Sequence, residues 1–187
     1  MITRSACVPE VKLYPHAPAA VTSEGDFEGY ASLFDVPDLS KDVVRPGAFV
    51  ESLERRGGAS IRMLWQHDPA EPIGTWLAIE EDARGLYVRG RLNLSVARAR
   101  EIHALMRDGA IDGLSIGFRV ERAVKERATG RRLLEKLDLW EISIVTFPML
   151  PTARVTQVKG GSDHLAATIR KAAERLFARP GFQAAWG

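Results

Sequence analysis

At 187 residues, the chain is long enough for one domain with appendages and too short for two full domains. Hydrophobic residues make up 45% of it and charged residues 27%, which is typical of a folded globular protein and excludes global disorder. The 26 basic and 24 acidic side chains leave a net charge of +2, so the chain lacks the basic excess typical of a nucleic-acid binder. Cys7 is the only cysteine, which excludes an internal disulfide and a multi-cysteine metal site.

The sequence also bears on location. Residues 1–20 contain no apolar stretch long enough for a signal peptide, and no run approaches the roughly 18 apolar residues of a membrane span. A single cysteine fits a reducing compartment. We therefore expect a protein of the cytoplasm, or of a particle assembled there, with no membrane and no nucleic acid as partner.

The chain divides into three zones. Residues 1–25 are broken by prolines and predict a tail. Residues 26–158 hold nearly all the strand signal and are expected to form the domain. Residues 159–187 predict a linker, marked by Gly160 and Gly161, followed by a C-terminal helical appendage.

The elements of the middle zone follow in chain order. Short runs of aromatic and branched residues, bounded by turns, predict strands over residues 27–34, 61–66, 73–79 and 86–94. The acidic stretch between the last two predicts a hairpin. Apolar residues at helical spacing then predict a helix over residues 96–106, with Ser95 as its N-cap and Gly109 as the left-handed residue after its end.

Two further strands follow this helix. Apolar residues alternate with others over 114–120, so that Ser115 lies on the face opposite the apolar one. Residues 137–147 are almost wholly apolar, which predicts a central strand covered on both faces. With no repeated βαβ unit, the pattern favours an α+β, mainly β fold: a closed or nearly closed antiparallel barrel with peripheral helices.

Three residues have the chemistry of an activated serine. Ser115 lies between Gly113 and Gly117, whose missing side chains are expected to leave room for a peptide. His67 is closely followed by a proline, which is expected to stop strand pairing and leave the ring at a strand end. Glu141 is a carboxylate in an apolar strand, where its charge requires a cation or strong donor such as a histidine. A serine becomes nucleophilic when a neighbouring base takes its proton and a third group orients that base.

Each residue also has a structural explanation: a solvated histidine, a serine that relieves crowding, and a glutamate paired with an arginine. Residues 113–117 match the Gly-x-Ser-x-Gly elbow of α/β-hydrolases as well, which suggests a cytoplasmic esterase. That elbow needs a helix after the serine, whereas strand alternation follows Ser115. The four histidines are scattered without metal-ligand spacing, so we expect no metal and no organic cofactor.

Five sequence blocks occur in order along the middle zone. They are residues 28–31 with Asp35, 42–49, 65–68 with 72–74, 113–118, and 139–148. In this order they resemble the phage prohead protease family, and the resemblance covers residues 26–158. It implies a fold similar to the herpesvirus assemblins: an antiparallel β-barrel ringed by helices, with the catalytic order histidine, serine, third residue.

The resemblance implies roles for individual residues. Ser115 is the nucleophile, and His67 is the general base that later protonates the leaving amine. Glu141 falls at the third position, where the herpesvirus relatives have a second histidine. Asp68 and Asp138 are alternatives for that position.

The resemblance also implies a function. It predicts a serine endopeptidase that processes the major capsid protein and its scaffold segment inside the assembling procapsid, and then cleaves itself. Oxyanion donors are expected in residues 148–154, with Arg154 adding positive charge, although this loop departs from the family's asparagine- and alanine-rich version. The alternative is a non-catalytic capsid assembly protein with a protease-like fold. A homodimer is left open.

Overall fold

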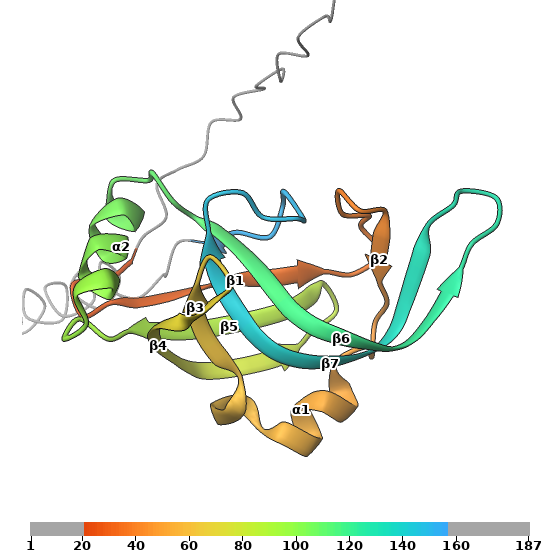
Figure 1. Ribbon diagram of the computed structural model, residues 1–187, viewed down its shortest axis with the longest axis horizontal. Coiled ribbons are helices and arrows are strands. Elements are labelled where there is room, and N and C mark those ends of the chain that lie inside the picture. The colour runs from red at the N-terminus through yellow and green to blue at the C-terminus, as the bar shows by residue number, and fades with distance from the viewer. Residues whose placement is uncertain (1–20, 157–187) are drawn as a thin grey trace, which may run out of the picture.

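The computed structural model describes residues 21–156, which form a curled, mainly β structure with two α-helices (Figure 1). The N-terminal elements are β1 (Asp26–Leu33), β2 (Asp42–Val44), α1 (Val50–Arg56), the 3-10 helix η1 (Gly58–Ser60), β3 (Arg62–Trp65) and β4 (Asp68–Glu81). They are followed by β5 (Gly85–Leu92), α2 (Ala97–Arg107), β6 (Gly113–Lys125), β7 (Arg132–Val145) and β8 (Val155–Thr156). The predicted C-terminal linker and helix, and most of the predicted tail, lie outside the described residues.

The eight strands of the described residues belong to one sheet, in the order β2-β7-β3-β4-β5-β1-β8 with β6 on the remaining edge of β7. β6 and β7 form a long antiparallel hairpin that crosses the molecule (Figure 1). The curl of the sheet brings β6 near β1. There the Leu114 amide donates to the Ala153 carbonyl at 3.0 Å and the Val155 amide to the Asp112 carbonyl at 2.8 Å. The result is a curled half-barrel.

The predicted mainly β class is confirmed, whereas the expected antiparallel barrel is not confirmed, since the sheet is a curled half-barrel that contains parallel pairs. β2 and β3 both pair with β7 in parallel, over residues 132–134 and 141–144 of β7 respectively. They lie one after the other along the same edge of β7, and the segment that joins them contains α1 and η1. The ring of helices is not confirmed, since the helices of residues 21–156 are only α1, α2 and the short 3-10 helix η1. No helix in this range is long and apolar enough to cross a membrane.

Most strands appear where the sequence predicts them, including the β4–β5 hairpin and the central, largely buried β7. The helix start differs: α2 has Val96 at its N-cap with no side-chain cap, and the Ser95 amide donates to the Asn93 side chain at 3.1 Å. The helix end is confirmed. Gly109 has a φ of 70° and its amide donates to the Met106 carbonyl at 3.1 Å, as a left-handed C-terminal glycine does.

The alternation of β6 and β7 separates the core from the candidate site. Leu114, Ile142 and Ile144 are fully buried in the hydrophobic core. Because successive side chains of a strand point to opposite faces, Ser115 and Ser143 lie on the other face, directly across from each other in the β6–β7 register. The core therefore fixes the strands that carry the site.

Asp138 anchors α1 to β7. Its side chain is buried and accepts hydrogen bonds from Arg55 at 2.7 Å, from Arg56 at 2.7 and 2.8 Å, and from the Trp140 indole at 2.7 Å. The hydrogen bonds from Arg56, with those from Trp140 and Arg55, hold the pKa of Asp138 well below its ordinary value. Asp138 was an alternative for the third catalytic position, but its partners are arginines and a tryptophan.

Replacing Asp138 by alanine is expected to lower the free energy of unfolding by about 2 kcal/mol, since Arg56 loses its buried partner while solvent still reaches the guanidinium. Urea denaturation at pH 7 measures the loss. The loss should shrink as the pH falls below about 4. The stabilising contribution of Asp138 is fully present above the pKa that this residue has in the unfolded chain, and it disappears as the pH falls towards the depressed pKa of the folded state. Asp35→Asn, which removes the charge of an exposed pair with Arg45 and suits the positive φ of that position, is the control. Equal losses in the two variants would contradict the anchoring role.

Candidate active site

A two-residue turn presents His67. Gln66 and His67 connect β3 to β4 with φ values of 53° and 61°, and Trp65 pairs with Asp68 across the turn. Positive φ at both central residues is typical of the type I′ hairpin, and it costs a non-glycine residue about 1–2 kcal/mol. β4 continues past Pro69, but its pairing with β3 is irregular there, since Trp65 pairs with Asp68 and Leu64 with Pro72. His67 thus lies at the strand end, as expected, and the sharp turn projects its ring.

Three hydrogen bonds hold this turn against the end of β7. The Gln66 amide donates to the Ile144 carbonyl at 3.1 Å, and its side chain donates to the Thr146 hydroxyl at 2.7 Å. The His67 amide donates to the Ser143 hydroxyl at 3.1 Å. These bonds stabilise the strained backbone and fix the position from which the imidazole extends.

The structure brings the three predicted residues together. His67 Nε2 lies 2.9 Å from Ser115 Oγ, and His67 Nδ1 lies 2.6 Å from Glu141 Oε1. A carboxylate only accepts, so the neutral imidazole carries its proton on Nδ1. Nε2 is then free to accept the Ser115 hydroxyl proton, which is the arrangement a general base requires.

Ser143 completes this network, and sequence reasoning missed it. Its hydroxyl donates to Glu141 Oε2 at 2.6 Å and accepts the His67 amide, and its side chain is fully buried. It thus links the backbone of the histidine to the carboxylate that orients the ring. Its signal in the sequence is a hydroxyl two residues after Glu141, on the same strand face, within an otherwise apolar strand.

The two glycines around Ser115 leave room for neighbouring groups of the protein itself. Gly117 lies opposite Glu141, and a Cβ there would stand 1.9 Å from Glu141 Oε1. A Cβ on Gly113 would stand 2.5 Å from the Val145 carbonyl oxygen. Gly117 therefore makes the space through which the Glu141 side chain reaches His67.

The environment tunes the imidazole. The hydrogen bond that His67 donates to Glu141 raises the pKa of the imidazole above the ordinary value of 6.5; burial opposes this rise, and the negative charge of Glu141 adds to it. The His67 side chain is 43% exposed, whereas Ser115 is 7% exposed. The base is thus open to solvent and to a leaving group, while the serine is sheltered.

The remaining predicted residues have other partners. Arg154 donates to Asp112 and, at 2.8 Å, to the Pro151 carbonyl, so its proposed contribution to an oxyanion site stays a prediction. Asp68 was an alternative to Glu141 for the third catalytic position, and its side chain accepts a hydrogen bond from the Ala70 amide at 2.8 Å.

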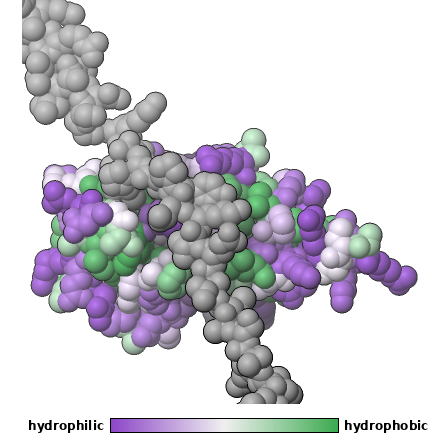
Figure 2. Space-filling view, turned by 90° about the horizontal axis from the view of Figure 1, so that it is seen from above, coloured by the Kyte–Doolittle hydropathy of each residue, from purple (hydrophilic) through white to green (hydrophobic). Residues whose placement is uncertain are grey.

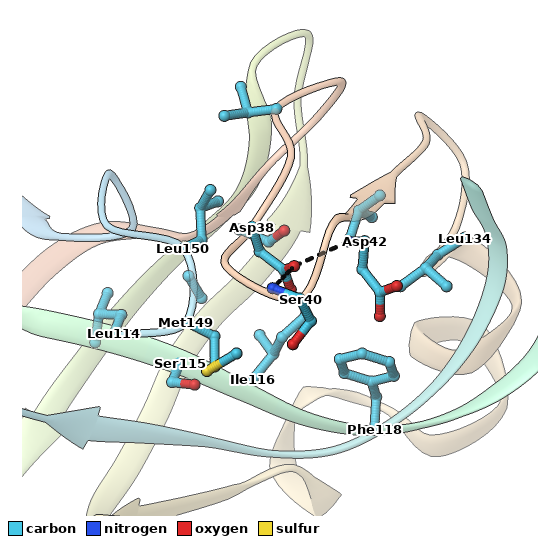
Figure 3. A pocket seen from close by; sticks show the side chains of 14 residues that line it. Asp38, Ser40, Asp42, Leu114, Ser115, Ile116, Phe118, Leu134, Met149 and Leu150 are labelled. Atoms are coloured by element: carbon cyan, nitrogen blue, oxygen red, sulfur yellow. Dashed lines mark hydrogen bonds between the residues drawn. The ribbon is translucent and has the colours of Figure 1, made fainter. Parts of the chain in front are cut away.

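A cavity of about 180 Å³ lies beside the serine (Figure 3). Ser115 is one of its lining residues, together with neighbours on β6, the loop between β1 and β2, and the loop at Met149 and Leu150. In Figure 1 these two loops, drawn in orange and blue, lie at the same end of the molecule. A substrate bond attacked by Ser115 would therefore lie next to this cavity.

The chain is similar to proteins of a known family. The model of the Caudovirus prohead serine protease family matches residues 16–167. The prohead protease of Enterobacteria phage HK97 is 36% identical over 138 residues, which cover 73% of this chain and 61% of that protein, so the chain spans less than two thirds of this relative. The structure of the bacteriophage T4 capsid assembly protease gives a TM-score of 0.52 at 14% identity, over 66% of this chain and 82% of that one, and supports the fold alone. The structure of the KSHV protease gives a TM-score of 0.48 at 10% identity, over 85% of this chain and 82% of that one.

Proposed function

Since this chain belongs to the Caudovirus prohead serine protease family, we propose that it is a serine endopeptidase that processes capsid or scaffold protein during prohead maturation. The observation that carries the proposal is the continuous hydrogen-bonded line from Ser115 through His67 to Glu141. Its substrate would be the major capsid protein with its scaffold segment, its place of action the procapsid, and self-cleavage its final step. Closure of the sheet into an assemblin-like barrel and a homodimer belong to the same proposal.

The geometry suits acyl transfer. Ser115 Oγ attacks the substrate carbonyl carbon while its proton passes to His67 Nε2. The imidazolium that forms is stabilised by the Glu141 carboxylate 2.6 Å from Nδ1. His67 then gives the proton to the leaving nitrogen as the carbon–nitrogen bond breaks, and water releases the acyl group by the same route.

The test uses a fluorophosphonate probe, which reacts with an activated serine, followed by co-expression with the capsid protein. Intact mass should show one adduct on the wild-type chain and none on Ser115→Ala, whereas Ser95→Ala, at an exposed serine, keeps the adduct. Capsid protein co-expressed with the wild type should be shortened, and that with Ser115→Ala should keep its full mass. Unlabelled wild type with unshortened capsid protein, in assembled proheads, would favour the non-catalytic assembly protein.

Ser143 is expected to act as a positioning residue. Replacing it by alanine should lower kcat/KM for peptide cleavage about 10-fold, since one hydrogen bond to a charged group is lost. Glu141 then loses one of its two donors, so the midpoint of the pH–rate profile should move as well. Ser143→Thr, which keeps the hydroxyl, should restore part of the rate. A loss of thermal stability with an unchanged pH profile in Ser143→Ala would mean a merely structural role.

A further inference from the structure

The cavity beside Ser115 lies along an open edge of β6. Among the described strands β6 pairs only with β7, and its other edge is engaged by the bond from the Leu114 amide to Ala153. In an antiparallel sheet alternate residues turn their backbone groups to the same edge, so Ile116 turns its N–H and C=O to the open edge as Leu114 does. An extended peptide can pair with such an edge. A substrate bound there would pass directly beside the nucleophile.

The walls of the cavity are mainly apolar. They include Val36, Val44, Ile116, Phe118, Leu134 and Met149 (Figure 3). Nearby hydrophobic side chains remain exposed around the two loops: Leu39 by 71% and Met149 by 44%. Figure 2, which is seen from above, shows green hydrophobic patches set among hydrophilic surface on this face. The cavity and its surroundings thus suit the carbon atoms of a substrate side chain.

Two carboxylates also line the cavity, and they differ in their partners. Asp42 is held by Arg132 in a two-point ion pair, which neutralises its charge. Asp38 Oδ1 accepts the amides of Ser40 at 2.8 Å and of Asp42 at 2.9 Å. Within residues 21–156, no lysine or arginine forms an ion pair with Asp38. The cavity therefore has a net negative charge, located at Asp38.

We infer that this cavity receives the substrate side chain that precedes the scissile bond, and that Asp38 makes it prefer a basic residue. An apolar stem packs on the walls, and a terminal ammonium or guanidinium meets the half-buried carboxylate, where a charge-assisted hydrogen bond is strong. An acidic side chain meets a like charge and is rejected. The inference rests on the proposed function and names the substrate class of the same site.

The test compares wild type with Asp38→Asn on a peptide mixture made from a denatured bacterial proteome, with new termini read by mass spectrometry. Asparagine keeps an oxygen that can accept both amides, so the change removes charge and leaves the loop bonds. Wild type should cut preferentially after lysine or arginine and rarely after glutamate or aspartate. In Asp38→Asn the ratio of basic to apolar residues before the cut should fall about 10-fold. Asp35→Asn, in the same loop but paired with Arg45, should keep the wild-type ratio.

Two outcomes overturn the inference while leaving the proposed function in place. One is a wild type that is labelled by fluorophosphonate and cuts without basic preference. The other is an equal ratio in wild type and Asp38→Asn. Asp38→Glu, which keeps the charge, gives a second reading should the asparagine variant fail to fold, and loss of the basic preference in Asp38→Glu would count against the inference. A wild type with no fluorophosphonate adduct and no cleavage would remove the proposed function and the inference together.

Discussion

Replacing Glu141 by glutamine is expected to lower kcat/KM for peptide cleavage by about 10³-fold with the fold intact. The carboxylate fixes the Nδ1 proton of His67 and stabilises the imidazolium formed during attack. A glutamine amide that turns its N–H₂ to Nδ1 forces the proton onto Nε2, which can then no longer accept from Ser115. In the opposite orientation the amide still lacks the negative charge. Either way the base is weakened at the step where it takes the proton.

The pH–rate profile should separate this role from a packing role. Only neutral imidazole accepts a proton, and Glu141 raises the pKa of His67, so the wild-type kcat/KM should rise with pH through a midpoint above 6.5. Glu141→Gln lacks the carboxylate that raises the pKa of His67. The midpoint of the profile should therefore move to lower pH, and the plateau of kcat/KM should fall. Peptide cleavage measured from pH 5 to about 9 shows both changes.

Glu135→Gln provides the matched control on the same strand. Glu135 pairs with Arg122 on the neighbouring strand, far along β7 from the site, so its loss should leave the rate and the midpoint as in the wild type. A Glu141→Gln enzyme with the wild-type midpoint and a plateau within about threefold of it would show that Glu141 is not the third member.

The three candidate residues were named from the sequence through the family resemblance, and two of them also break the pattern of their strands. Glu141 is a charge in an apolar run, and Ser115 is a hydroxyl between glycines. Their partners were less accessible. Ser143 resembles the filler hydroxyls of many strands, and only its distance of 2.6 Å from Glu141 shows its role. The turn at Gln66 and His67 also lacks the glycine or asparagine that usually indicates positive φ.

The fold shows the same division between local and distant information. The β4–β5 hairpin is legible because its strands are joined by a short turn and pair with each other. The parallel pairing of β3 with β7 joins residues nearly 80 positions apart, such as Met63 and Ile142, and nothing in either strand's own pattern specifies the partner or its direction. That pairing places the end of β3, at Trp65, beside Ile144 and so brings the turn that carries His67 close to Ser143 and Glu141. The sequence could thus indicate which residues form the site, but not how they are arranged in space.

Gly117→Ala is expected to lower kcat/KM about 10²-fold or more, although Gly117 touches no reacting atom. The added Cβ would stand 1.9 Å from Glu141 Oε1 and 2.7 Å from its Cδ, a distance that no contact tolerates. Glu141 is the flexible partner, so its carboxylate should leave His67 while the backbone stays in place. The free energy of unfolding should change by less than about 1 kcal/mol, since alanine suits a strand at least as well as glycine.

A double-mutant cycle tests whether Gly117 acts through Glu141. If the alanine only displaces the carboxylate, Gly117→Ala in the Glu141→Gln background should cost little beyond the single Glu141→Gln change. The pH midpoint of Gly117→Ala should also fall, as in Glu141→Gln, because both remove the group that raises the pKa of His67. Additive losses in the cycle, with an unmoved midpoint, would instead mean that the Cβ obstructs the substrate. In that case the space above Gly117 belongs to the peptide, as the sequence alone suggested, and the placement of Glu141 depends on Ser143.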